Sequence, residues 1–248
     1  MRGVLVCSTR SVALWLGVPL LVSALACGTS KPPATPTRTG PTPERGTPSA
    51  NQKVFPTPTL AGQHELLALV PAQGLGDWQH WLQAGSRAAG DNVVTTLNDP
   101  LYGHVVEFRR TCEARDGGAA GLYQTLALDV AGYRELRIYL VGRVLYEEGG
   151  NIANRDPRWF PEGALQVRIK YLSASGREQE WYHGFYVQPV DGADHETFTQ
   201  VAPGEWFTYT SPDLTKLPDP PRRITELRVY GFGWQFQGQL ADLRLIGS

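Results

Sequence analysis

Short runs of alternating apolar and polar residues fill the chain after residue 61, and they restrict its fold more than any other feature. In residues 165–171, Leu, Val, Ile and Tyr occupy the odd positions and Gln, Arg and Lys occupy the even ones. Successive side chains point to opposite faces of a β-strand, whereas a helix brings every third or fourth residue to one face. The alternation therefore predicts strands that each bury one face.

Similar runs recur along the rest of the chain, separated by Gly, Pro and Asp. The predicted strands are residues 93–97, 105–109, 122–130, 136–141, 165–171, 178–188, 206–210, 224–232 and 239–246. Only residues 65–70 and 77–84 are candidates for helices. Roughly nine short strands are typical of a sandwich or a barrel.

Two short turns predict which strands are neighbours. Residues 130–133 (Val-Ala-Gly-Tyr) separate the strands at 122–130 and 136–141, which we expect to pair antiparallel. Residues 173–176 (Ser-Ala-Ser-Gly) separate the strands at 165–171 and 178–188, and this arrangement predicts a β-hairpin.

The amino terminus has the pattern of an export signal. Arg2 and Arg10 precede an uncharged apolar run, residues 11–26, whose 16 residues are fewer than the roughly 20 that a transmembrane helix needs. The run ends in Ala-Leu-Ala-Cys-Gly, residues 24–28, which resembles the lipobox of bacterial lipoproteins. This resemblance implies that Cys27 receives a diacylglycerol and begins the mature protein. The alternative is an ordinary secretory signal cut after Ala26.

A Pro/Thr-rich segment follows Cys27 and lacks recurring apolar residues. Such a segment cannot bury enough surface to offset the entropy of ordering, and its prolines favour extended conformations. The predicted organisation is a signal peptide at 1–26, a lipidated cysteine with a disordered stalk at 27–61, and a β-sandwich domain at 62–248. We therefore expect an extracytoplasmic protein held at the cell envelope by a lipid anchor in a membrane.

Charge and cysteine content exclude several classes of function. The chain has 23 Lys and Arg against 24 Asp and Glu, a formal net charge of −1, without a basic stripe. Nucleic acid is therefore not an expected partner. Cys112 is the lone cysteine of the predicted domain, so an intramolecular disulfide cannot form there.

Three segments of the predicted domain have a recognisable pattern: residues 121–126 (Gly-Leu-Tyr-Gln-Thr-Leu), 133–139 (Tyr-Arg-Glu-Leu-Arg-Ile-Tyr) and 240–246 (Leu-Ala-Asp-Leu-Arg-Leu-Ile). They resemble strands of the galactose-binding-domain-like jelly roll, the fold of many carbohydrate-binding modules. The resemblance covers about residues 62–248 and implies an all-β, antiparallel β-sandwich that binds a ligand. In such domains an acidic residue of the last strand often holds a structural calcium, and Asp242 matches that position. A full ligand set is not defined, because Asp77, Asp99 and Glu107 are candidates only by their place in early strands and loops.

A sugar-binding surface needs flat aromatic rings beside polar groups. The first candidate is a platform of Trp181 and His183 with the neighbouring Arg168 and Tyr139. Its alternative places Trp181 in the core, with Tyr182 pointing outward.

The second candidate is the long loop at 147–163, which carries Trp159 and Phe160. Loops of this length in compact domains are uncommon and often functional. The alternative is a flap whose aromatic residues cover the edge of the sandwich.

Catalysis is a minor alternative. Glu178 and Glu180 share one face of a predicted strand, and retaining glycoside hydrolases use two carboxyl groups about 5–5.5 Å apart. The two residues follow a hairpin turn, where solvated charges are common, and Gly-x-Ser-x-Gly and His-Glu-x-x-His motifs are absent. The sequence thus predicts a non-enzymatic domain that binds a glycan, or alternatively a structural module that docks an envelope protein.

Overall fold

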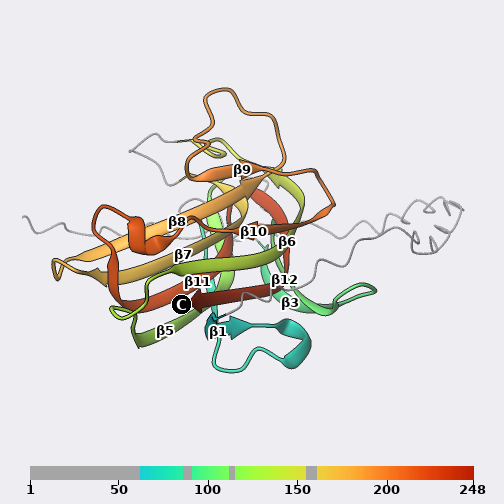
Figure 1. Cartoon of the computed structure of the whole chain (residues 1–248). Coiled ribbons are helices and arrows are strands. Elements are labelled where there is room, and N and C mark those ends of the chain that lie inside the picture. The colour runs from blue at the N-terminus through green and yellow to red at the C-terminus, as the bar shows by residue number, and fades with distance from the viewer. Residues whose placement is uncertain (1–61, 86–90, 112–114, 155–160) are drawn as a thin grey trace, which may run out of the picture. The chain divides into compact units, whose positions relative to one another are not determined.

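The computed structural model describes residues 62–85, 91–111, 115–154 and 161–248 (Figure 1). In these ranges the long elements are all strands, and the two helices are single 3-10 turns, η1 (Pro71–Gln73) and η2 (Leu214–Lys216). The described ranges contain no helix of the length and apolarity needed to cross a bilayer. Cys27, Cys112, Trp159 and Phe160 lie outside the described residues.

The strands form two six-stranded sheets. Sheet A contains, in spatial order, β10 (Trp206–Thr210), β6 (Leu136–Glu148), β12 (Gln235–Gly247), β4 (Gly103–Thr111) and β3 (Asp91–Asp99), and β1 (His64–Leu69) also pairs with β12. Sheet B contains, in spatial order, β2 (Gln79–Gln83), β5 (Gly118–Asp129), β11 (Pro221–Gly233), β7 (Gly163–Ser173), β8 (Glu178–Tyr186) and β9 (Phe198–Gln200).

The two sheets bury one large apolar core between them. On β7 the odd residues Leu165, Val167 and Ile169 are fully buried, while Arg168 and Lys170 are only partly buried. In sheet A, Leu136, Ile138 and Leu140 face the same core from β6. The layers are visible in Figure 1, where β8, β7, β11 and β5 lie side by side. The predicted all-β sandwich of mainly antiparallel strands is confirmed.

The hairpin at 165–188 is also confirmed. β7 and β8 pair antiparallel from Leu165 opposite Phe185 to Leu172 opposite Glu178. The turn closes with a hydrogen bond from the Gly176 N–H to the Ser173 carbonyl at 2.9 Å. Gly176 has a φ of +80°, a conformation that glycine adopts without steric cost.

The predicted pairing of the strands at 122–130 and 136–141 is wrong. These segments are β5 in sheet B and β6 in sheet A, so they belong to opposite sheets and do not pair. The connection is anchored to other segments: the Val130 N–H donates to the Arg222 carbonyl and the Leu136 N–H donates to Asp213. These two hydrogen bonds fix the connection in which the chain passes from sheet B to sheet A.

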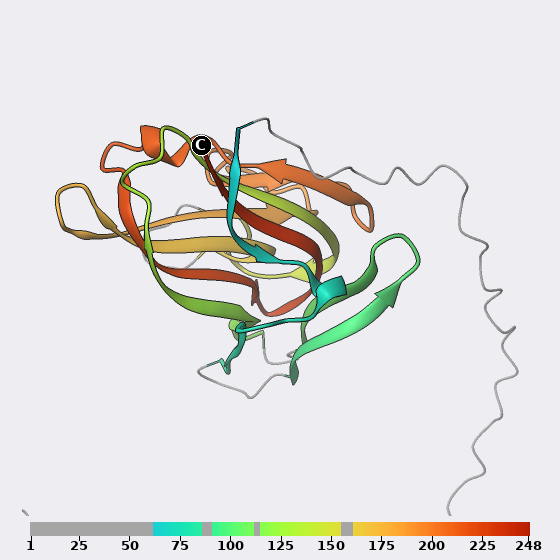
Figure 2. The same cartoon turned by 60° about the horizontal axis from the view of Figure 1, so that its bottom comes forward.

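The two segments proposed as helices are strands. The Leu, Ala and Glu residues at 65–70 favour helix locally, but β1 pairs along β12 from His64 opposite Gly247 to Leu69 opposite Leu243 (Figure 2). The second segment contains β2, which pairs with β5. In both cases pairing with a distant strand overrides the local preference.

The described residues contain twelve strands where roughly nine were expected. β1, β2 and β9 account for the difference. β9 has only three residues and pairs parallel to β8, so its alternation is too short to recognise in the sequence.

Candidate functional site

A pocket of about 200 Å³ opens on the outer face of sheet B, the face turned away from the core. Its lining residues come from four strands and one loop. They are Trp81 and Gln83 on β2, Arg228, Tyr230 and Phe232 on β11, Gln166 and Arg168 on β7, Glu180 and Tyr182 on β8, and Pro161.

Strand alternation places these side chains on one surface. On β11 the inward residues Leu227 and Val229 are buried in the core, so Arg228 and Tyr230 point outward. Register then aligns the strands: Tyr230 lies opposite Gly121 on one side and Gln166 on the other. The pocket is therefore assembled from residues that are far apart in the chain.

An aromatic pair forms one wall of the pocket. The rings of Trp81 and Tyr230 meet edge to face, with centroids 5.2 Å apart and an interplanar angle of 81°. Both residues lie opposite Gly121, the β5 residue between them. Because a Cβ on Gly121 would stand 2.3 Å from the Tyr230 Cβ and 2.5 Å from the Val229 carbonyl oxygen, only glycine allows this close approach.

Two arginines form the polar part of the pocket. The guanidinium carbon of Arg228 lies 3.9 Å from the Trp81 ring centroid, and its Nη2 is 2.8 Å from Glu226 Oε1. Arg168 donates from Nη2 to the carboxylate of Glu180. Their side chains are 13% and 17% exposed, so both cations are held largely out of water.

Tyr230 supplies a buried hydroxyl to this polar part. Its hydroxyl donates to Gln166 Oε1 at 3.1 Å. Burial raises the pKa of Tyr230 to about 12, although the charges of Arg168 and Arg228 oppose the shift. The hydroxyl therefore stays protonated and neutral at physiological pH.

The pocket combines an apolar ring surface with several hydrogen-bonding groups. Among the described residues that line it, Glu180 is the one carboxylate, and it is paired with Arg168. Glu178, its neighbour in the proposed catalytic pair, is exposed and is not one of the lining residues. The arrangement suits binding of a small polar group better than a reaction that requires two facing carboxyl groups.

Known proteins offer a distant comparison. No protein-family model matches the chain, and no curated protein matches it in sequence. Several solved structures are similar in fold. The family 11 carbohydrate-binding module of a cellulosomal cellulase from Clostridium thermocellum is 11% identical, with a TM-score of 0.42 over 77% of this chain and 97% of that module.

A xylan-binding domain of family 22 is 12% identical, with a TM-score of 0.38 over 74% of this chain and 94% of that domain. An exo-β-agarase is 6% identical, with a TM-score of 0.40 over 73% of this chain and 25% of the agarase. At this distance the similarity identifies neither a ligand nor site residues in the chain.

The predicted platform of Arg168, Trp181 and His183 does not form. Trp181 lies opposite Ile169, and His183 lies opposite Val167, so both point toward the core, whereas Arg168 points outward. His183 is 6% exposed and stacks on Tyr209 at 4.3 Å, and its Nε2 is 2.9 Å from Thr199 Oγ1. Burial lowers the pKa of His183 from 6.5 to about 4, which keeps the imidazole neutral in the folded protein. The alternative that placed Trp181 against the core and Tyr182 outside is the arrangement observed.

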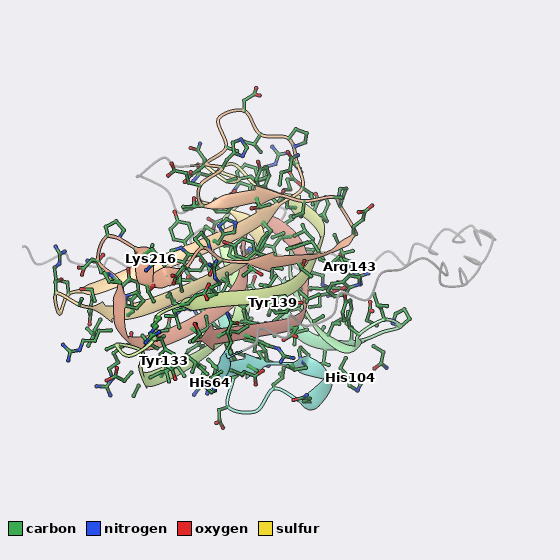
Figure 3. The ribbon with its side chains drawn as sticks, in the orientation of Figure 1. His64, His104, Tyr133, Tyr139, Arg143 and Lys216 are labelled. Carbon is green, nitrogen blue, oxygen red and sulfur yellow. The ribbon has the colours of Figure 1, made fainter. Side chains whose placement is uncertain are left out.

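Tyr139 lies on the other sheet, apart from Arg168. It is on β6 with Arg143, on the outer face of sheet A (Figure 3). Tyr139 is 3% exposed, and burial followed by the nearby Asp242 carboxylate raises its pKa to about 12. It belongs to a small apolar cluster with Val141 and Ile246. Whether Tyr139, Trp181 or His183 contacts a ligand stays a prediction.

Asp242, the calcium candidate, accepts the Arg244 Nε–H on both carboxylate oxygens, at 2.9 and 3.0 Å. Two of the other candidates are also engaged, since Asp99 contacts Arg143 and Glu107 accepts from Gln239, while Asp77 is exposed. Within the described ranges, no three His, Cys, Asp or Glu residues gather as a metal site would require. Calcium binding at Asp242 therefore stays a prediction.

The long loop at 147–163 is anchored at both described ends by buried carboxylates. Glu147 accepts the Val187 and Gln188 N–H groups at 2.6 and 3.1 Å, and Glu162 accepts the Asn151 N–H at 2.9 Å. Burial raises the pKa of both carboxyl groups, and these backbone bonds oppose the shift. Pro161, next to Glu162, lines the pocket, so this loop ends at the rim of the site. Trp159 and Phe160 lie outside the described residues.

Sequence reasoning found Arg168 but missed Trp81, Arg228 and Tyr230. Gln79, Trp81 and Gln83 alternate as on a strand with an exposed aromatic residue. The expectation of a helix at 77–84 hides this pattern. Arg228 and Tyr230 alternate with buried Leu227 and Val229. Alternation shows that these residues point outward, but only the pairing of the strands shows that they share one pocket.

Proposed function

We propose that the domain binds carbohydrate without transforming it, in the pocket on the outer face of sheet B. The supporting observation is the combination of Trp81 and Tyr230 with the donors of Arg168 and Arg228 around one cavity. A sugar ring has an apolar C–H face that packs on aromatic rings and a fringe of hydroxyl groups that hydrogen-bond.

The size of the pocket fits one unit of a longer glycan. Its volume of about 200 Å³ is smaller than the roughly 300–1,000 Å³ of pockets that enclose a drug-sized ligand. The pocket is not enclosed, so a polysaccharide can place one sugar in it while the rest of the polymer lies outside. Carbohydrate-binding modules of known structure resemble the fold. The proposal itself is based on the residues that line the pocket of this chain.

Trp81→Ala is expected to weaken glycan binding by at least about 10-fold, because it removes the aromatic wall and the surface that Arg228 stacks on. A glycan array first identifies a bound sugar, and isothermal titration calorimetry then measures its Kd with both proteins. Tyr146→Ala is the matched control, since Tyr146 is an aromatic residue 45% exposed outside the pocket. Binding that is unchanged by Trp81→Ala contradicts this site. A protein partner recovered in the absence of any bound glycan favours the docking-module alternative.

We also propose that Cys27 carries a lipid that holds the domain at the outer side of a membrane. Its support is the sequence alone: the basic start, the apolar run and the small residues before the cysteine. Cys27→Ser is expected to move the full-length protein from the membrane fraction to the soluble extracytoplasmic fraction, with loss of the acyl mass from the mature terminus. Cys112→Ser, the control, leaves the distribution unchanged. A Cys27→Ser protein that stays in the membrane fraction contradicts the anchor.

A further inference from the structure

Arg168 and Arg228 lie directly opposite each other on neighbouring strands of sheet B. Residues in such a pair have Cβ atoms about 4.5–5.5 Å apart, and like charges in this position are destabilising. Nothing in the packing of the core requires the pair, because both residues are on the outer face of the sheet. The fold therefore tolerates a repulsive pair at the centre of its pocket.

The two acidic residues around the pair do not balance the positive charge once the neighbouring Lys170 is counted. Arg168, Lys170 and Arg228 contribute three positive charges, and Glu180 and Glu226 contribute two negative charges, which leaves +1. Glu226 is shared, with Oε1 2.8 Å from Arg228 and 3.8 Å from Lys170. Glu180 has a side chain 46% exposed, so its ion pair with Arg168 is weakened by water.

Each arginine also has a buried donor that is not used. The Nε atoms of Arg168 and Arg228 are shielded from solvent and make no hydrogen bond within the described part of the chain. A buried donor without an acceptor is destabilising, and more so when the group is charged. A carboxylate has two oxygens, so it can accept from both arginines at once, and charge-assisted hydrogen bonds between guanidinium groups and carboxylates are among the strongest in proteins.

We propose that the pocket selects a sugar that bears a carboxylate, a uronic acid unit of an acidic polysaccharide, and that Arg168 and Arg228 determine this selectivity. This inference rests on the proposed carbohydrate-binding function. Trp81 and Tyr230 hold the sugar ring, and the two arginines hold its carboxylate. The bound carboxylate offsets the electrostatic repulsion between the two arginines and accepts hydrogen bonds from their unused Nε–H groups.

The test compares acidic oligosaccharides with their neutral counterparts. The probes are oligomers of galacturonate, of mannuronate and guluronate, and of hyaluronan, each paired with its carboxyl methyl ester, and a sulfated galactan oligomer. The native protein is expected to bind at least one acid at least about 10-fold more tightly than its ester, by calorimetry at low ionic strength. The preference is expected to shrink as salt is added, because ions screen charges that are partly exposed.

Variants assign the preference to the two arginines. Arg168→Gln and Arg228→Gln are each expected to lower affinity for the acid about 10-fold more than affinity for the ester, so that the preference for the acid is lost. Arg223 is an exposed arginine on β11, the strand that carries Arg228, and it lies outside the pocket. Arg223→Gln is therefore the control. Glu180→Gln removes the carboxylate that competes for Arg168, so it is expected to tighten binding of the acid, a gain that a folding defect cannot produce.

The possible outcomes distinguish the selectivity for a carboxylate from the proposed carbohydrate binding. Equal affinity for acids and esters overturns the carboxylate selectivity and leaves carbohydrate binding intact, as does binding of neutral glycans alone. A preference for the sulfated oligomer over every carboxylated one also overturns it. Failure to bind any glycan on an array overturns both proposals.

Discussion

Phe185→Ala is expected to lower the free energy of unfolding by about 3–5 kcal/mol, the usual cost of removing a fully buried phenylalanine. Phe185 is 0% exposed on β8 and contacts the opposite sheet, with ring centroids 4.6 Å from Phe207 and 5.1 Å from Tyr209 on β10. The cavity would therefore open between the two sheets, at the edge where β8 and β10 meet.

Urea unfolding followed by tryptophan fluorescence measures this loss, and the midpoint of thermal unfolding should fall by roughly 6–20 °C. Phe185→Leu keeps most of the volume and is expected to cost less than half as much. Tyr146→Ala, at an exposed site, is expected to change the free energy of unfolding by less than about 0.5 kcal/mol. A loss below about 1 kcal/mol for Phe185→Ala would mean that this edge of the sandwich is not packed as described.

Gly121→Ala is expected to lower the free energy of unfolding by about 1–3 kcal/mol and to abolish glycan binding, although it adds only one methyl group. The new Cβ would lie 2.5 Å from the Val229 carbonyl oxygen and 2.8 Å from the Tyr230 Cα. These are backbone atoms of the paired strand, so β5 and β11 must separate locally. The movement displaces Tyr230 from Trp81 and from the pocket.

Chemical unfolding and calorimetry with the bound glycan measure the two effects separately. Gly132→Ala is the matched control, since a Cβ at Gly132 meets no atom within 4 Å. Glycan binding at native strength by a stably folded Gly121→Ala protein would contradict the role of this position beneath the pocket.

Most strand positions could be predicted from the sequence, but sheet membership could not, apart from the β7–β8 hairpin. The alternation at β7 is local, because each of the core residues Leu165, Val167 and Ile169 is two positions from the next. The partner of a strand is decided elsewhere in the chain: β5 pairs with β2 and β11, and not with the β6 that follows it. A turn signal between two strands shows only that the chain bends.

The aromatic face of β8 shows why the candidate platform was assigned to the wrong side. Trp181, His183 and Phe185 alternate with Tyr182, Gly184 and Tyr186, so both faces carry rings and periodicity does not distinguish them. Register resolves the choice, because the first three lie opposite Ile169, Val167 and Leu165 on β7. A polar residue such as Arg168 marks its own face unambiguously, and for this reason it was the pocket residue that could be found from the sequence.

The pairing of β1 with β12 has a mechanical consequence. His64 begins β1 at the Gly247 end of β12, and the other end of β12 leads through a tight turn to Phe232 in the pocket. If a polymer is bound and the N-terminal segment is held by a lipid, as proposed above, a pull on the polymer directs force lengthwise along β1 and β12. Antiparallel strands pulled lengthwise load all of the hydrogen bonds between them at the same time. We therefore expect β1 and β12 to separate only at a higher force than strands whose hydrogen bonds break one after another.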